Sequence, residues 1–240
     1  MNTKKIDRKQ TLMVAHRGVS KLEQENTTLA FVAAGNRSYF GIETDVHVTA
    51  DGQFVAIHDS NTLRVSGDEY IVEETDFKTL RELRLFDLDG SHTREDIRIP
   101  TLEEYIAICK KYEKVAVLEL KNAMTEEVVA QIVERIRQAE YLDRVIFIAF
   151  NFDNLVYVRR HSSNQPVQYL IGKVEVEENL ARAKAQGFDV DIYYKVLTEE
   201  IVHDLHEAGL RVNCWTVDEP ADAETLVAWG VDFITTNILE

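Results

Sequence analysis

Residues 41–59 read GIETDVHVTADGQFVAIHD, and this stretch decides how the strands of the chain are counted. It contains two apolar β-runs, 41–48 and 53–59, separated by Asp51-Gly52. An Asp-Gly dipeptide between two such runs predicts a hairpin, because the tight turn requires residues that adopt a positive φ. We therefore expect one run to be an antiparallel excursion and the other to belong to the main sheet.

Elsewhere the chain alternates short apolar β-runs with amphipathic helical stretches such as 101–112, which opens with the capping-box residues Thr101 and Glu104. The remaining β-runs are 11–16, 115–120, 144–150, 167–172, 189–194, 211–217 and 231–236. Alternating βα units predict parallel strands. Without the excursion, the nine runs leave eight such strands. Eight strands close a (β/α)8 barrel, or TIM barrel, of about 250 residues.

An open doubly wound sheet is the alternative fold, but no Gly-x-Gly-x-x-Gly follows the first run. Residues 60–100 are the least regular part of the chain, with charges interleaved among leucines. We expect one barrel domain over residues 1–240. Residues 60–100 would form a small insertion after the second barrel strand and its hairpin, packed over the rim.

Composition restricts the possible partners and compartment. The chain of 240 residues has 27 basic and 42 acidic residues and a net charge of −15. This balance argues against binding to nucleic acid or to anionic membranes. A signal-peptide pattern and a transmembrane run are not visible. Two cysteines do not form a disulfide framework. We expect a cytoplasmic protein without stable membrane association, and its oligomeric state is left open.

Acidic residues recur in the predicted strands. Glu43 and Asp45 are two positions apart and share one face of a strand, and Glu119 lies in another β-run. If that face is the barrel interior, the carboxylates need a cation to offset their repulsion. Three oxygen ligands suit Mg²⁺ or Ca²⁺. In isolation, the pair also fits surface charges on a solvated strand.

Candidate catalytic and binding residues lie at the ends of the runs, where a barrel carries its active site. His16 and His58 can divide general-base and general-acid roles, although a strand-end histidine is also a common structural residue. Arg17 and Lys121 would bind a phosphate or carboxylate group. Trp215 either stacks on substrate at the rim or packs in the core.

In their order along the chain these motifs resemble the glycerophosphodiester phosphodiesterase family, of the bacterial, cytoplasmic type. The match extends over nearly the whole sequence, and each motif alone would be weak. The matching motifs are His16-Arg17-Gly18, Glu25-Asn26-Thr27, the run 43–59 ending in His58-Asp59, PTLEE (100–104), LELK (118–121) and WTVD (215–218).

The resemblance implies a metal-dependent TIM-barrel enzyme that hydrolyses small-molecule glycerophosphodiesters to glycerol 3-phosphate and an alcohol. It implies roles for three groups of residues: His16 and His58 as the acid–base pair, Glu43, Asp45 and Glu119 as ligands of Mg²⁺ or Ca²⁺, and Arg17 and Lys121 as phosphate ligands. Which histidine is the base, and whether the glycerol hydroxyl or water attacks first, stay open at this point.

Three positions depart from the family pattern, namely Gln24, Ala149 before Phe150-Asn151, and Ile238-Leu239 after the last strand. They concern the rim and the substrate preference. Two other functions remain open. One is a lysophospholipase D acting on lipid-like diesters, which requires an apolar rim. The other is a barrel that binds a metal or phosphate without turnover, which would not need both histidines.

Overall fold

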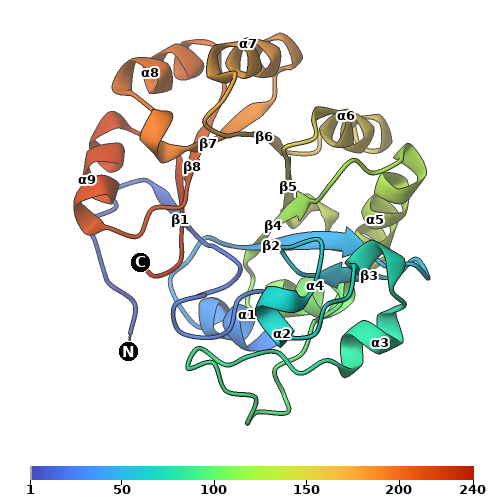
Figure 1. Ribbon diagram of the computed structural model, residues 1–240. Coiled ribbons are helices and arrows are strands. Elements are labelled where there is room, and N and C mark those ends of the chain that lie inside the picture. The colour runs from blue at the N-terminus through green and yellow to red at the C-terminus, as the bar shows by residue number, and fades with distance from the viewer. Residues whose placement is uncertain (1) are drawn as a thin grey trace.

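The computed structural model describes residues 2–240, and in these residues eight parallel strands close into a barrel surrounded by helices (Figure 1). The strands follow one another around the barrel in chain order, and β9 pairs with β1 to bring the ends of the sheet together. The predicted (β/α)8 fold is confirmed. The barrel strands are β1 (Leu12–Ala15), β2 (Gly41–Val48), β4 (Val115–Leu120), β5 (Val145–Ala149), β6 (Val167–Ile171), β7 (Asp189–Tyr193), β8 (Val212–Trp215) and β9 (Phe233–Thr236).

The hairpin predicted from Asp51-Gly52 is present. Strand β3 (Phe54–Ala56) pairs antiparallel with the end of β2, so that Val46 lies opposite Ala56. Gly52 has a φ of +75° and donates its N–H to the carbonyl of Thr49 at 2.9 Å. Strand β3 is therefore the antiparallel excursion, and β2 is the barrel strand.

Helices connect the strands and cover the outside of the barrel (Figure 1). Helix α4 opens as predicted, because Thr101 and Glu104 exchange the two hydrogen bonds of a capping box. The α-helices are α1 (Thr28–Gly35), α2 (Leu63–Ser66), α3 (Phe77–Glu82), α4 (Leu102–Lys111), α5 (Glu126–Gln138), α6 (Phe152–His161), α7 (Val176–Gln186), α8 (Glu199–Glu207) and α9 (Pro220–Trp229). Short 3₁₀ helices are η1 (Val72–Glu74), η2 (Leu142–Arg144) and η3 (Tyr194–Val196).

Apolar side chains fill two regions around the barrel wall. The larger cluster lies between the strands and the helices and includes Phe31, Tyr105 and Phe147. A smaller cluster fills the barrel interior and includes Val117 and Phe233. Polar and charged side chains lie above this interior plug, at the carboxyl ends of the strands. Across residues 2–240, no helix has both the length and the apolar character needed to cross a bilayer.

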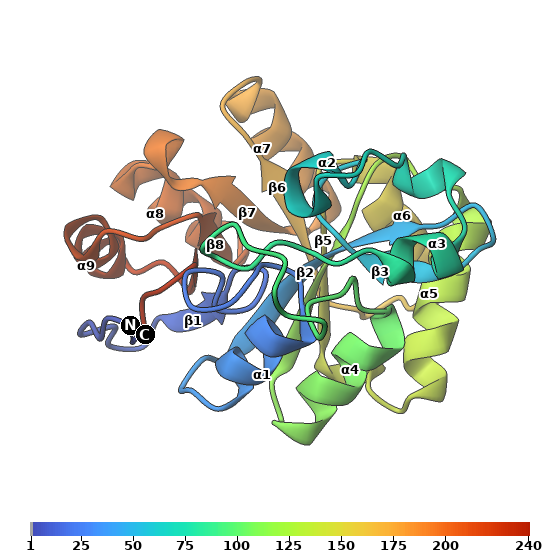
Figure 2. The ribbon, with the colours of Figure 1, turned by 60° about the horizontal axis from the view of Figure 1, so that its bottom comes forward.

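The inserted segment 60–100 packs on the β3 side of the barrel, next to α1 and α4 (Figure 2). Its apolar side chains form a third cluster with Val55 and Ile57 of the β3 region, to which Leu80 and Ile97 contribute from the insertion. Because this cluster shares residues with the hairpin of the barrel, we propose that 1–240 is one domain and that the insertion does not fold independently.

Replacing Leu80 with alanine tests this proposal. Leu80 is fully buried, so Leu80→Ala should lower the free energy of unfolding by about 2–5 kcal/mol. The loss should appear as a shift of one cooperative transition when unfolding is followed by circular dichroism. Leu88→Ala is the control, because Leu88 is 50% exposed and should change stability by no more than about 0.5 kcal/mol. A separate transition for the insertion in the unmodified protein would contradict the proposal.

Candidate active site

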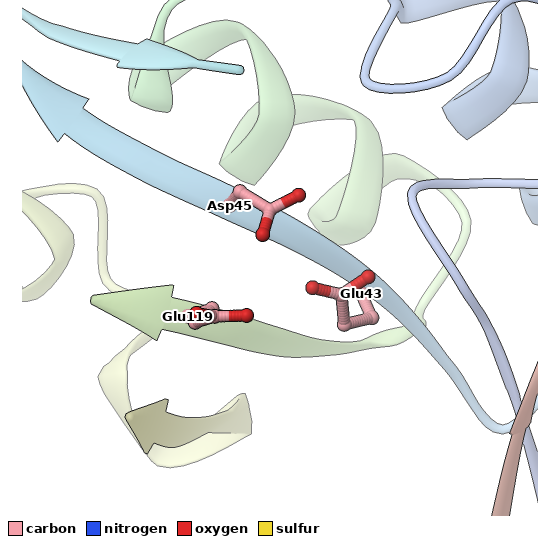
Figure 3. Close-up of side chains that lie close together, drawn as sticks. All are labelled: Glu43, Asp45 and Glu119. Carbon is pink, nitrogen blue, oxygen red and sulfur yellow. The ribbon is translucent and has the colours of Figure 1, made fainter. Parts of the chain in front are cut away.

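Three carboxyl groups meet at the carboxyl-terminal end of the barrel. Glu43 and Asp45 project from β2 and Glu119 projects from β4, and all three point into the same space (Figure 3). Each offers an oxygen within 4.8 Å of the others, and all three residues are buried. The parallel pairing of β2 with β4 sets this arrangement, because it places Asp45 directly beside Glu119.

Two basic side chains lie against this acidic triad. Lys121 Nζ lies 2.8 Å from Glu119 Oε1 and 3.3 Å from Asp45 Oδ1. Arg17 donates its backbone N–H to Glu43 Oε2 at 2.8 Å, and its Nε lies 3.3 Å from Asp45 Oδ2. Arg17 reaches this position because β1 ends at Ala15 and the chain turns, with a φ of 53° at Arg17 and 78° at Gly18. A Cβ on Gly18 would lie 2.5 Å from the backbone of Ala30, so the turn packs directly on α1.

The electrostatics of the triad reflect its burial. Burial, and then the charge of Asp45, raises the pKa of Glu43 well above its usual value and that of Glu119 to about 7. Burial also opposes ionisation of Asp45, but Lys121 and Arg17 outweigh it and lower the pKa of Asp45. The two positive side chains, Arg17 and Lys121, therefore do not fully balance the negative charge of three ionised carboxyl groups. A divalent cation fits this set, because every donor is a hard oxygen and the excess negative charge is buried.

Asn237, which follows the last barrel strand, holds His16 in one orientation. Its Nδ1 lies 2.7 Å from Asn237 Oδ1, while Asn237 Nδ2 donates to Asp218 Oδ2 at 2.8 Å. The Asp218 contact fixes the Asn237 amide so that its oxygen faces the imidazole. Nδ1 of His16 is then the protonated nitrogen, and Nε2 keeps a free lone pair. Burial, and then the charge of Arg17, lowers the pKa of His16 to about 4.

His58 has a charged partner instead of a neutral one. Its Nδ1 lies 2.6 Å from Asp59 Oδ1, and Asp59 Oδ2 accepts from Arg64 Nε at 2.6 Å. Burial first, then the charges of Arg17 and Lys121, lower the pKa of His58, whereas the charge of Asp45 and the hydrogen bond to Asp59 act to raise it. The carboxylate can stabilise the imidazolium form whenever His58 is protonated.

A chain of ion pairs connects the inserted segment to both sides of the site. Arg64 of α2 makes two hydrogen bonds to Glu25, of 2.8 Å and 3.0 Å, besides its bond to Asp59. Glu25 also accepts from Arg17 Nη1 at 2.9 Å. Arg64 therefore joins the partner of His58 to the partner of Arg17.

Six of the eight predicted residues line one cavity, and Asp45 and Lys121 lie next to it. Its volume is about 60 Å³, and it is lined by His16, Arg17, Glu43, His58, Glu119, Trp215, Ile148, Phe150, Leu170, Asp191 and Thr235. Lys121 is not part of this lining but bonds to Glu119, which is. Trp215 packs at the interior apolar cluster and forms a T-shaped pair with Phe150, with ring centroids 5.7 Å apart. It thus lies at the cavity rather than in the outer core.

Sequence reasoning gave no role to several residues that hold the site together. Asn26 donates to Asp45 Oδ2 at 2.8 Å and accepts from Thr44 Oγ1 at 2.7 Å. Glu25, Asn26 and Asp59 stand inside the family motifs, so the sequence could have indicated a role for them. Asp191 could also have been singled out, because it is an acid in the middle of an apolar run. No sequence feature pointed to Arg64, since it lies in the irregular insertion.

Together the fold and the site define a barrel enzyme whose rim carries an acidic cluster, two cations and two imidazoles around one cavity. The chain belongs to the glycerophosphoryl diester phosphodiesterase family, whose family model matches residues 16–240. The sequence resemblance to this family is therefore confirmed. By family the protein is a phosphoric diester hydrolase.

Individual relatives agree with this assignment. A glycerophosphodiester phosphodiesterase of Caldanaerobacter subterraneus is 31% identical, over 95% of this chain and 94% of that protein. A solved glycerophosphodiester phosphodiesterase of Parabacteroides distasonis is 30% identical, with a TM-score of 0.78 over 95% of this chain and 93% of that one. An Oleispira antarctica phosphodiesterase, solved with the product sn-glycerol-3-phosphate, shares the fold at 24% identity, with a TM-score of 0.86 over 98% and 96% of the two chains.

Removing the side chain of Arg64 tests whether the insertion positions the site. Arg64→Ala should lower kcat/KM by about tenfold, because a misplacement of a catalytic group by 1 Å costs on the order of 10²-fold and the loss of one anchor shifts it by less. Steady-state kinetics with glycerophosphocholine measure the effect. Arg160→Ala removes a comparable exposed pair with Glu126 and should leave kcat/KM unchanged. Wild-type kcat/KM in Arg64→Ala would contradict the positioning role.

Proposed function

We propose that the protein hydrolyses small-molecule glycerophosphodiesters to glycerol 3-phosphate and an alcohol. The observation that carries the proposal is the convergence of both histidines, Arg17 and two members of the acidic triad on one cavity of a barrel that belongs to this family. A non-catalytic barrel that only binds a metal or phosphate would not need two imidazoles at this cavity.

We assign Glu43, Asp45 and Glu119 as the ligands of a divalent cation, Mg²⁺ or Ca²⁺. The buried excess of negative charge and the all-oxygen donor set support this assignment. When bound, such a cation supplies Lewis-acid polarisation and charge neutralisation to a phosphodiester.

Arg17 and Lys121 are the proposed phosphate ligands. A phosphodiester is an anion, and further negative charge develops on its oxygens as the transition state forms, so fixed cations stabilise that state more than the ground state. Both side chains are anchored by carboxylates and are mostly buried, which keeps them in place without reorganisation. Ordinary surface cations would lack this anchoring.

His16 is the proposed general base. The contact to Asn237 leaves Nε2 of His16 with its lone pair, and the lowered pKa keeps the imidazole neutral at pH 7. A neutral imidazole can accept the proton of the attacking hydroxyl group, which is either the neighbouring glycerol hydroxyl or water.

His58 is the proposed general acid. Its partner Asp59 has a pKa of about 2, because Arg64 and His58 lower it against the opposing effect of burial, so the carboxylate stays charged. This charge offsets part of the fall in the pKa of His58 that burial, Arg17 and Lys121 cause, and it favours the imidazolium that a general acid requires. His58 would give its proton to the leaving alcohol oxygen. In-line displacement places the attacking and leaving oxygens on opposite sides of phosphorus, which suits two imidazoles from different strands.

A lysophospholipase D acting on lipid-like diesters is the second candidate, and exposed apolar residues of the rim favour it. Phe150 after β5 is 48% exposed and Val174 after β6 is 73% exposed, while Leu63 and Ile71 of the insertion are 48% exposed each. A lipid chain would find apolar surface there. Against it stands the net charge of −15, which disfavours adsorption to anionic membranes.

We also propose that the protein acts in the cytoplasm. Both of its cysteines, Cys109 and Cys214, are free and buried, as is usual for proteins of a reducing compartment.

Chelation tests the metal assignment. Excess chelator should abolish turnover of glycerophosphocholine, and added Mg²⁺ or Ca²⁺ should restore it. The same ion should raise the unfolding temperature of the metal-free protein, because a ligand that binds only the folded state stabilises it by about 2.7 kcal/mol at a hundred times its Kd. Glu43→Gln should weaken this effect, and Glu103→Gln, a change on the exposed side of α4, should not. Full activity in excess chelator would refute the assignment.

The two histidines can be separated by the leaving group of the substrate. His16→Ala and His58→Ala should each lower kcat on glycerophosphocholine by about 10²–10⁴-fold. A 4-nitrophenyl ester has a leaving group that needs no proton, so His58→Ala should lose much less on that substrate, while His16→Ala should stay slow on both. His203→Ala, an exposed change on α8, is the control. Equal losses on both substrates for both variants would show that the histidines only position the substrate.

A further inference from the structure

Asp191 is a buried acid at the cavity that the proposed mechanism does not use. It lies on β7, is 1% exposed and lines the cavity together with His16, His58 and Glu119. Its Oδ1 atom is buried and has no hydrogen-bond partner among the described residues. A buried polar atom without a partner destabilises the folded protein, so its presence at an active-site cavity calls for a ligand.

The polar groups around Asp191 do not supply a hydrogen bond to this oxygen. Directly neighbouring interior polar groups satisfy one another, since Asn213 donates to Gln168 at 3.0 Å and accepts from Thr235 at 3.2 Å. Trp215 donates its indole N–H to the backbone carbonyl of Asp191 at 3.2 Å, which leaves the carboxyl group free.

A hydroxyl group is the ligand that fits this carboxyl best. The unpartnered atom is a carboxyl oxygen, which accepts a hydrogen bond whether or not the group is protonated, and a hydroxyl group can donate that bond. A glycerophosphodiester carries such hydroxyl groups on its glycerol moiety.

We propose that Asp191 binds the terminal hydroxyl of the substrate's glycerol moiety and thereby selects diesters whose glycerol is not acylated at that oxygen. This inference rests on the proposed function and adds a specificity-determining residue to it. In this proposal Arg17 and Lys121 hold the phosphate, the glycerol end points inward to Asp191, and the variable alcohol points to solvent. The cavity of about 60 Å³ has room for a small polar fragment, since one water needs about 10–15 Å³, but it has none for an acyl chain.

The test compares two substrates in wild type and in two variants. The substrates are glycerophosphocholine and its analogue built on propane-1,2-diol, which lacks only the terminal hydroxyl. In wild type, loss of this hydroxyl should lower kcat/KM by roughly 10- to 100-fold, because it leaves Asp191 unpaired again. In Asp191→Val the same loss should cost less than about threefold, and Asp191→Asn should be intermediate. Lysophosphatidylcholine acylated at that oxygen should be a poor substrate of wild type.

Stability provides a second measurement that a purely structural role would not produce. Asp191→Val removes an unpartnered buried polar group, so its unfolding temperature should rise while its activity falls. Asp189→Asn is the matched control on the same strand. Its side chain accepts from the backbone N–H of Arg211 at 2.8 Å outside the cavity, so kinetics should not change.

Several outcomes would overturn the inference. The same penalty for the missing hydroxyl in wild type and Asp191→Val would do so. A loss in Asp191→Val that occurs with choline or ethanolamine esters but not with glycerol esters would assign the residue to the headgroup instead. A fall in unfolding temperature parallel to activity would make it structural. If wild type hydrolyses none of the diesters, the proposed function fails. Calorimetry with glycerol 3-phosphate and with propane-1,2-diol phosphate then tests Asp191 separately. Equal Kd values for the two ligands would show that Asp191 does not bind the terminal hydroxyl.

Discussion

The buried charge of the acidic triad is the constraint on which the rest of the site depends. Three carboxyl groups meet within 4.8 Å in the interior of the barrel, where water screens their repulsion poorly. Arg17 and Lys121 balance part of this charge, and they can do so only from fixed positions. The sharp turn after β1 and the parallel register of β2 with β4 provide those positions. A divalent cation completes the balance in our proposal.

The barrel brings these charged groups together with the other polar residues of the site. Its lower interior is filled with apolar side chains such as Val117 and Phe233, so polar groups gather at the carboxyl ends of the strands. Each strand contributes few residues there, and closure of the sheet brings them around one cavity. The two histidines then differ through their partners. Asn237 contacts Nδ1 of His16 with a neutral amide, and Asp59 contacts Nδ1 of His58 with a carboxylate.

The inserted segment and the residues around the cavity add contacts and surfaces that the barrel strands alone do not provide. Arg64 ties the insertion to Glu25 and Asp59, so a part of the chain outside the barrel alternation takes part in holding the site. Phe150, which lines the cavity, and Val174, which follows β6, are exposed apolar residues, whereas Asp191 is a buried acid in the cavity lining. In our proposal the buried carboxyl group of Asp191, and not the exposed apolar surface, decides which diesters the enzyme accepts.

The barrel, and the site residues that stand in the family motifs, could be predicted from the amino-acid sequence. Strand and helix periodicity is a local property, and the Asp51-Gly52 turn marks one run of its hairpin as an excursion, so eight parallel strands can be counted along the chain. The grouping of Glu43 with Asp45 also follows from strand parity. Tertiary structure alone decided the rest, because contacts such as His16 with Asn237 or Arg64 with Glu25 join residues far apart in the chain and depend on barrel closure and on the path of the insertion. The unpartnered state of Asp191 is likewise a property of its surroundings, which no single run of sequence contains.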